Sequence, residues 1–170
     1  MAKDLLVVVD VQASWAASNP KITQAIGETV DEKRGEMDIL WIYHKYFMPG
    51  CVVHPDRATR HGGYSKDPKL QPVFQPHAGD WVMSKWQYNG FTNPALEKFL
   101  RRQNYDTQTF VGYKTLRCVF ETARAAARLG FNPRIATDLI SGGHDIVRSP
   151  ERLKSRMPCG VELIQRVDLV

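Results

Sequence analysis

The sequence has no apolar stretch long enough to cross a membrane. Its longest apolar run, LLVVV at residues 5–9, ends at Asp10, whereas a membrane-spanning helix needs about 20 apolar residues. The N-terminus has one lysine before this short run and no small-residue cleavage site, so we expect no secretory signal. These absences predict a cytoplasmic protein with no membrane partner.

Cysteine is also scarce. The three cysteines, Cys51, Cys118 and Cys159, lie far apart and form no CxxC pair. The sequence therefore offers neither a disulfide framework nor a zinc knuckle, which fits a reducing compartment. At 170 residues the chain is long enough to bury a core without such cross-links, so we expect one domain over residues 1–170.

Acidic residues are in short supply in the second half of the chain. Lys and Arg number 23 against 18 Asp and Glu, which gives a formal net charge of +5, and residues 101–170 carry the excess. A basic segment is typical of nucleic-acid-binding proteins. Here, however, the cations are scattered along helix-like stretches, which favours solvated helix faces and predicts no nucleic-acid partner.

Short apolar runs alternate with helix-like segments. Apolar patterns predict strands at residues 5–10, 38–44, 80–85, 107–112, 133–138 and 161–167. Periodicity and Asn-Pro starts predict helices at 20–34, 93–103, 118–129 and 149–157, and residues 45–79 form a long loop. This order predicts an α/β protein with a three-layer, Rossmann-like fold: a mostly parallel sheet of about six strands, flanked by helices on both faces.

Three chemically capable residues fall at one edge of that sheet. Ligands of open α/β sheets bind outside the carboxyl ends of the strands. Asp10 ends the first predicted strand, Lys85 ends the third, and Cys118 follows the fourth. This combination suits nucleophilic catalysis, in which Asp10 accepts the thiol proton, Lys85 balances the charge and Cys118 attacks.

Each of the three residues also has a structural interpretation. At the start of a helix and beside Arg117, the Cys118 thiol is expected to have a lowered pKa. Most free cysteines, however, are small buried apolar side chains. Asp10 can instead cap a helix, and Lys85 can be a surface lysine. The three residues alone leave both interpretations open.

Longer motifs carry a family resemblance. LLVVVDVQ, SKWQYNGFTNPAL and VGYKTLRCVFETA, in combination, resemble the isochorismatase-like cysteine hydrolases, a superfamily that includes nicotinamidases and N-carbamoylsarcosine amidases. The resemblance extends over most of the chain, from residue 4 to about residue 166, and is weakest in the 45–75 loop. The matching positions are Asp10, Gln12, Lys85, Phe91, Leu96, Gly112, Thr115, Cys118, Val119, Thr122, Ala123 and Asp138.

This resemblance implies a mechanism and a site. Asp10, Lys85 and Cys118 would form a catalytic triad, and Cys118 would attack an amide to give a thioester that water then hydrolyses. A cis peptide bond would join Tyr113 to Lys114. The oxyanion hole would consist of the backbone N–H groups of Lys114 and Cys118. The resemblance implies no cofactor for this chemistry.

The loop after the second predicted strand departs from the family pattern. Nicotinamidases usually carry Asp-x-His there as part of a metal site, whereas this chain has YHKYFMPGCVVHP. The spacing of His44, Cys51, His54 and His61 fits no standard zinc pattern, so we expect no metal.

The substrate pocket is expected to include Gln12, Phe47, Trp86, Tyr88, Phe91 and Arg117. The aromatic members can wall a flat or small apolar group, although Trp86 and Phe91 can equally pack in the core or at a subunit interface. Arg117 can support a thiolate, pair with an acidic substrate or point to solvent.

We therefore predict a cysteine-dependent hydrolase that cleaves a C–N bond in a small amide. One alternative is an isochorismatase-type vinyl-ether hydrolase, which would use Asp10 and Lys85 with Cys118 as a bystander. The other is a non-catalytic small-ligand-binding protein on the same scaffold. The expected partners are a small-molecule substrate and further copies of the chain, since the resemblance implies a homo-oligomer, either a dimer or a tetramer.

Overall fold

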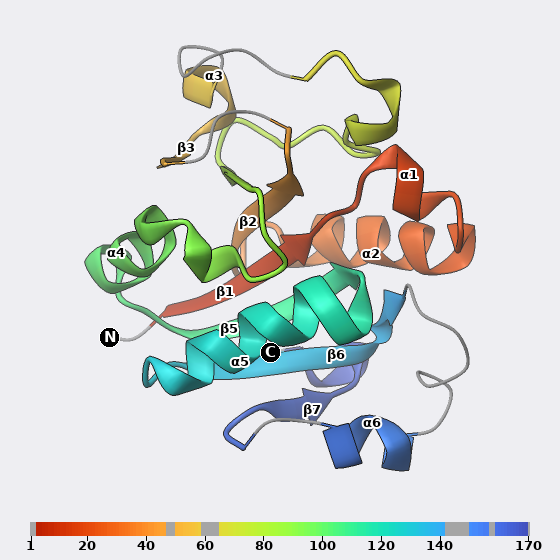
Figure 1. Cartoon of the computed structure of the whole chain (residues 1–170), viewed down its shortest axis with the longest axis vertical. Coiled ribbons are helices and arrows are strands. Elements are labelled where there is room, and N and C mark those ends of the chain that lie inside the picture. The colour runs from red at the N-terminus through yellow and green to blue at the C-terminus, as the bar shows by residue number, and fades with distance from the viewer. Residues whose placement is uncertain (1–2, 47–49, 59–64, 142–149, 157–158, 170) are drawn as a thin grey trace.

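A seven-stranded sheet runs through the middle of the computed structural model, which describes residues 3–46, 50–58, 65–141, 150–156 and 159–169 (Figure 1). The spatial order of the strands is β3-β4-β2-β1-β5-β6-β7. All neighbours are parallel except β3 and β4, which are antiparallel. The strands are β1 (Lys3–Val9), β2 (Asp38–His44), β3 (Val52–Val53), β4 (Trp81–Lys85), β5 (Tyr105–Tyr113), β6 (Asn132–Ser141) and β7 (Glu162–Ile164).

Helices cover both faces of this sheet, with α4 and α5 in front and α2 behind in Figure 1. Two of these helices are capped at the N-terminus by an asparagine. The side chain of Asn19 accepts from Ile22 N–H, and that of Asn93 accepts from Ala95 N–H. No helix among the described residues is long and apolar enough to cross a membrane. The helices are α1 (Ala13–Ala16), α2 (Pro20–Lys33), α3 (Pro55–Ala58), α4 (Pro94–Gln103), α5 (Phe120–Arg128) and α6 (Pro150–Arg156).

Two apolar cores, one on each face, hold the layers together. The first contains buried side chains of α4 and α5, such as Phe99 and Phe120, and the second contains Ile26 and Val30 of α2. Strand β1 contributes to both cores because its apolar residues alternate between the two faces. The three-layer α/β architecture predicted from the sequence is therefore confirmed.

The chain changes direction across the sheet at β1. From β1 it proceeds to β2 on one side and later returns to pair β5 on the other. In open α/β sheets, the crevice at such a reversal is where ligands bind, outside the carboxyl ends of the strands. The ends of β1 and β5, at Val9 and Tyr113, therefore mark the place for a site.

The structure differs from the predicted elements mainly in the 45–79 loop. This segment contains the edge strand β3, helix α3 and a 3₁₀ turn at Pro68–Leu70, so the sheet has seven strands instead of about six. Two residues are too few for a period-2 pattern, so β3 leaves no signal in the sequence. Strand β6 runs three residues further than predicted, to Ser141, and the short helix α1 was not predicted.

Candidate active site

Asp10 follows β1 directly, at the point where the chain leaves the sheet. Its backbone has a φ of +52°, a left-handed conformation that few residues other than glycine adopt. Its N–H donates to the carbonyl of Ile42 at 2.8 Å. The residue is 1% exposed, so a carboxylate is held out of water at the carboxyl end of the central strand.

Lys85 ends β4 and is completely buried. Its ammonium donates to Asp10 Oδ2 at 2.7 Å and to the carbonyl of Gln87 at 3.3 Å. Because a buried ammonium must be paired to remain charged, this ion pair is a fixed feature of the site. The other carboxylate oxygen, Asp10 Oδ1, is buried and has no hydrogen-bond partner among the described residues, so it is available to accept a proton.

Cys118 lies in a π-helical turn, Thr115–Val119, which leads from β5 into α5. The carbonyl of Lys114 accepts from the N–H groups of Arg117 and Val119. Helix α5 therefore begins at Phe120, two residues later than predicted. Single π-turns of this kind are frequent at functional sites.

Burial raises the pKa of the Cys118 thiol to about 11, and the negative charge of Asp10 acts in the same direction. The positive charge of Lys85 and the N–H of Lys114 lower the pKa without offsetting burial. The expected lowering at a helix start is therefore wrong for the resting protein, because desolvation outweighs the dipole and the cations. At neutral pH the thiol is protonated and lies close to a carboxylate.

The turn before the thiol is closely constrained. The peptide bond between Tyr113 and Lys114 is cis. Gly112 has a φ of +114°, and a Cβ there would lie 2.1 Å from the carbonyl oxygen of Val9, so only glycine fits where β5 passes the end of β1. The hydroxyl of Tyr113 donates to the carbonyl of Asn19 at 3.0 Å. These contacts fix the position of the turn that carries the thiol.

The side chain of Thr122 stabilises the turn that carries Cys118. Its hydroxyl donates to the carbonyl of Cys118 at 2.6 Å and accepts from the N–H of Gly90 at 3.0 Å. Gly90 begins a 3₁₀ turn shortly after β4, so Thr122 links the nucleophile turn to the segment that follows Lys85. The sequence identifies Thr122 only as part of a motif, without this role.

Gln12 is not a pocket residue, contrary to the sequence prediction. The side chain is completely buried. Its Nε2 donates to the carbonyls of His44 and Leu70 at 3.1 and 2.5 Å, and its Oε1 accepts from the His44 N–H at 2.7 Å. Because backbone groups occupy both ends of the amide, Gln12 ties the 65–72 segment to the ends of β1 and β2 instead of meeting a substrate.

Two of the aromatic residues predicted for the pocket lie elsewhere. Phe91 is partly buried and stacks with Phe131, with ring centroids 6.2 Å apart, because its 3₁₀ turn faces the core. Trp86 is 50% exposed, since the chain leaves the sheet after β4, and it does not line the cleft described below. Tyr88 does line that cleft, and Phe47 lies outside the described residues.

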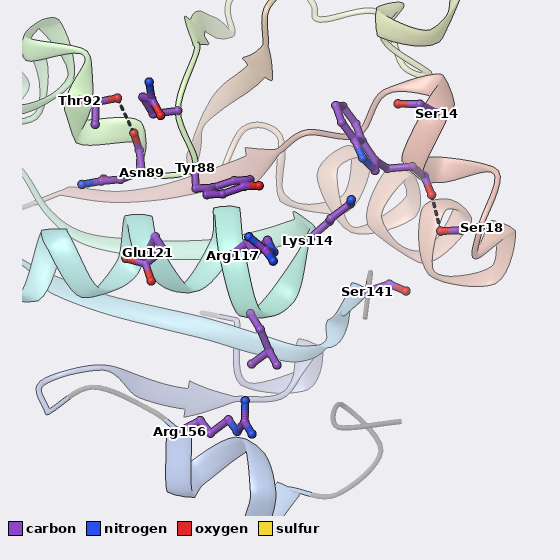
Figure 2. Close-up of a pocket in the computed structure, with 13 residues that line it drawn as sticks. Ser14, Ser18, Tyr88, Asn89, Thr92, Lys114, Arg117, Glu121, Ser141 and Arg156 are labelled. Carbon is purple, nitrogen blue, oxygen red and sulfur yellow. Dashed lines mark hydrogen bonds between the residues drawn. The ribbon is translucent and has the colours of Figure 1, made fainter. Parts of the chain in front are cut away.

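A cleft of about 1240 Å³ opens beside the turn that carries the thiol (Figure 2). The turn contributes Lys114, Leu116 and Arg117 to its lining. In Figure 2, Tyr88 and Arg117 lie close together in the middle, and Ser14 and Ser18 lie near one end. The triad residues are at most 5% exposed and do not line the cleft themselves. The thiol thus lies just behind the lining.

The cleft also uses residues that the sequence analysis missed: Ser14, Trp15 and Ser18 near α1, Gln87, Asn89 and Thr92 after β4, Glu121, Ser141 and Arg156. Most are ordinary polar residues with no recognisable spacing. Ser141 is the one member of this set that its position along a strand could have identified from the sequence. It ends β6 at the same edge of the sheet as the triad, but the strand was predicted to end at residue 138.

The candidate metal ligands do not assemble in the described part of the chain. The ring of His54 stacks on Trp81 at 3.9 Å, and its Nδ1 bonds to the carbonyl of Asp80 at 2.8 Å. Among the described residues, no three His, Cys, Asp or Glu side chains form a group that could hold a metal ion. His61 falls outside these residues.

Comparison with known proteins assigns the chain to a group. A family model described as the isochorismatase domain matches residues 4–165. The chain is 27% identical over 148 residues to the "Secreted isochorismatase effector Isc1" of Verticillium dahliae, and the match covers 84% of this chain and 74% of that protein.

Solved structures share the fold. The pyrazinamidase of Pyrococcus horikoshii, solved in complex with zinc, has a TM-score of 0.75 at 22% identity and matches 96% of this chain and 99% of its own. N-carbamoylsarcosine amidase from Thermoplasma acidophilum has a TM-score of 0.76 at 20% identity, with 99% and 98% covered. At these identities the likeness establishes the architecture alone.

Proposed function

The chain belongs to the isochorismatase family, and from that premise we propose that it is a cysteine-dependent hydrolase of a C–N bond in a small amide. The observation that carries the proposal is the buried Asp10–Lys85 ion pair at 2.7 Å, set beside a buried, protonated thiol and behind an open cleft. Two of the structural neighbours are named as amidases, which supports this choice of bond.

The first half of the reaction forms a thioester. Asp10 Oδ1 accepts the thiol proton as the Cys118 sulfur attacks the amide carbon, and the N–H groups of Lys114 and Cys118 donate to the oxyanion. When the tetrahedral intermediate collapses, the C–N bond breaks and the nitrogen takes the proton from Asp10. Ammonia or an amine leaves, and the acyl group stays on sulfur.

The second half hydrolyses the thioester. A water molecule loses a proton to Asp10 and attacks the acyl carbon, and the C–S bond then breaks. The sulfur recovers a proton from Asp10, and the carboxylic acid departs. Throughout both halves, the ammonium of Lys85 balances the negative charge of Asp10 through their ion pair.

A vinyl-ether hydrolase is the second candidate. It is favoured by one observation: with a pKa of about 11, the thiol is neutral at physiological pH, whereas Asp10 has a free oxygen for proton transfer. In this reaction Asp10 and Lys85 would act on the substrate, and Cys118 would be a bystander.

The experiment that separates the candidates is a substrate panel tested with Cys118→Ala and Asp10→Asn. The panel contains pyrazinamide, N-carbamoylsarcosine, other small amides and isochorismate, with ammonia or pyruvate release as the readout. The amidase proposal predicts that an amide is hydrolysed and that both variants are inactive. A Cys118→Ala protein that keeps its activity while Asp10→Asn loses it would favour ether hydrolysis. Specific binding without turnover of any panel member would favour a non-catalytic ligand-binding protein.

We also propose that the protein works in the cytoplasm. All three cysteines are free thiols, and the proposed reaction needs Cys118 reduced. Reducing compartments keep thiols in that state, so thiol-labelling of the protein in intact cells should find all three cysteines reduced.

A further inference from the structure

The cleft beside the thiol carries positive charge that no described residue neutralises. Its lining contains Lys114, Arg117 and Arg156 but only one acidic residue, Glu121. Glu121 is itself ion-paired with Arg124. Within the described parts of the chain, none of the three lining cations forms an ion pair with a carboxylate.

Ion pairing elsewhere on the described surface is mixed, since exposed Arg102 and Arg128 have no ion pair with a described carboxylate. By contrast, Arg34, Arg101, Arg134 and Arg166 each form an ion pair with a carboxylate. Unpaired cations gathered in a concave site attract anions and raise their local concentration. The gathering of three such cations around one cleft, whose one acidic residue is already paired, therefore indicates an anionic ligand.

Arg117 is the best placed of the three cations. It directly precedes Cys118 in the π-helical turn, and its guanidinium carbon lies 4.9 Å from the centroid of the Tyr88 ring. This cation–π contact holds a long side chain against the cleft wall. Figure 2 shows the pair with Lys114 beside them. The planar donors of a guanidinium match the oxygens of a carboxylate or phosphate.

We propose that the preferred substrate is a small amide that also carries a negatively charged group, and that Arg117 selects for that group. This inference rests on the proposed function, because it concerns the same cleft and the same thiol. Lys114 and Arg156 add to the positive potential. A neutral amide of equal size would reach the thiol without this attraction and would therefore react more slowly.

Two alkylating reagents of nearly equal size test the inference without a known substrate. Iodoacetate is negatively charged, whereas iodoacetamide is neutral and is itself a primary amide. With either reagent the Cys118 sulfur displaces iodide, so that an S–C bond replaces the C–I bond. Because both reagents react with the same thiolate, the ratio of their rates does not depend on the pKa of the thiol. Peptide mass spectrometry gives the ratio at Cys118, and the neutral thiol 2-mercaptoethanol provides the reference.

We expect the iodoacetate-to-iodoacetamide ratio at Cys118 to exceed the reference ratio by about fivefold at low salt, the effect of one unit charge pair about 4 Å apart in water. Arg117→Gln should remove most of this preference, and Arg117→Lys should keep part of it. The matched control is Arg128→Gln, an exposed arginine of α5 outside the cleft, which should leave the ratio unchanged. Added salt should lower the ratio by screening.

The anion that best protects Cys118 from alkylation indicates the charged group that the substrate carries. Sodium acetate, sodium phosphate or sodium chloride is added at equal ionic strength, and the rate at which iodoacetamide alkylates Cys118 is measured in each salt. Stronger protection by acetate indicates a carboxylate-bearing amide, and stronger protection by phosphate indicates a phosphorylated one. No protection beyond that of chloride would contradict an anion site.

The other outcomes separate the inference from the function on which it rests. A reactive Cys118 with the reference ratio, or equal effects of Arg117→Gln and Arg128→Gln, would overturn the inference and leave the amidase proposal standing. A Cys118 that reacts with neither reagent at any pH would overturn the proposed function, and the inference with it.

Discussion

Asp10, Lys85 and Cys118 are almost fully buried, so water screens the interactions among their charges only weakly. The ammonium of Lys85 stabilises the carboxylate, and the carboxylate together with burial stabilises the neutral thiol. In the mechanism proposed above, the site stores its proton on sulfur and passes it to Asp10 when a substrate arrives. In this arrangement the thiol becomes strongly nucleophilic only when it transfers that proton.

The pKa of Cys118 gives the first prediction. Its alkylation rate should rise with pH until about pH 11, whereas an ordinary thiol levels off above about 8.5. Asp10→Asn removes a charge that raises the pKa, so the alkylation profile should shift to lower pH while hydrolysis is lost. Iodoacetamide labelling of Cys118 between pH 6 and pH 12, quantified by mass spectrometry, checks both. An unchanged or upward-shifted profile in Asp10→Asn would contradict this account.

The same raised pKa links stability to pH. A folded state that favours the neutral thiol is stabilised fully below the unfolded pKa of about 8.5, and this contribution is lost as pH rises towards the folded value. Between about pH 8.5 and pH 11, the free energy of unfolding of Cys118→Ala should therefore fall less steeply with pH than that of the wild-type protein.

The ion pair gives a prediction for stability. Lys85→Met fills a similar volume but leaves Asp10 buried without a partner, which should lower the free energy of unfolding by about 3–5 kcal/mol. The double variant Asp10→Leu/Lys85→Met has no buried charge and should recover most of this loss. Denaturant unfolding measures both effects. If the free energy of unfolding of the single variant fell by less than about 1 kcal/mol, the two charges would be more accessible to water than the structure indicates.

Strand β5 and its turn act as one element that places the thiol beside Asp10. Gly112→Ala would set a methyl group 2.1 Å from the carbonyl oxygen of Val9, so β5 must move away from the end of β1. We expect a loss of at least about 3 kcal/mol in unfolding free energy, together with lower turnover. The control is Gly130→Ala, which has a φ of +84° but no atom within 4 Å and should cost only about 1–2 kcal/mol. If both variants lost the same unfolding free energy, the close approach of Gly112 to the carbonyl oxygen of Val9 would be unimportant.

Elements with strong local signals are predictable from the sequence. Strand β1 is a continuous apolar run because both its faces are buried, and α2 and α4 begin with Asn-Pro because the asparagine caps the helix. By contrast, β3 has two residues, and the π-helical turn before α5 depends on tertiary packing. Such features leave no periodic pattern, so the sequence could not predict them.

For the whole molecule, the strand-end rule brings together residues that are distant in the sequence. It correctly places Asp10 and Lys85 side by side, because both end parallel strands of one sheet. It could not predict that the side-chain amide of Gln12 is hydrogen-bonded to backbone groups, or that Phe91 faces the core. Both features depend on how the loops fold back onto the sheet. The raised pKa of Cys118 was also missed, because the degree of burial is a property of the complete fold.

Assembly of several chains remains a prediction at this scale. Trp86 and Tyr88 are about half exposed after β4, near the cleft, and large exposed aromatic side chains are enriched at interfaces. Sedimentation should give two or four times the mass of one chain, and Trp86→Ser should weaken the assembly. A monomer at all concentrations would exclude the dimer and the tetramer.

The central claim is that the Cys118 sulfur carries an acyl group during turnover. Rapid-quench mass spectrometry tests it most directly, with the amide that the panel shows to be hydrolysed fastest. We predict that the peptide containing Cys118 gains the mass of the acyl group during turnover, that hydroxylamine removes it, and that Cys118→Ala neither gains the mass nor hydrolyses the amide. Steady hydrolysis without any such adduct, retained in Cys118→Ala, would contradict the claim.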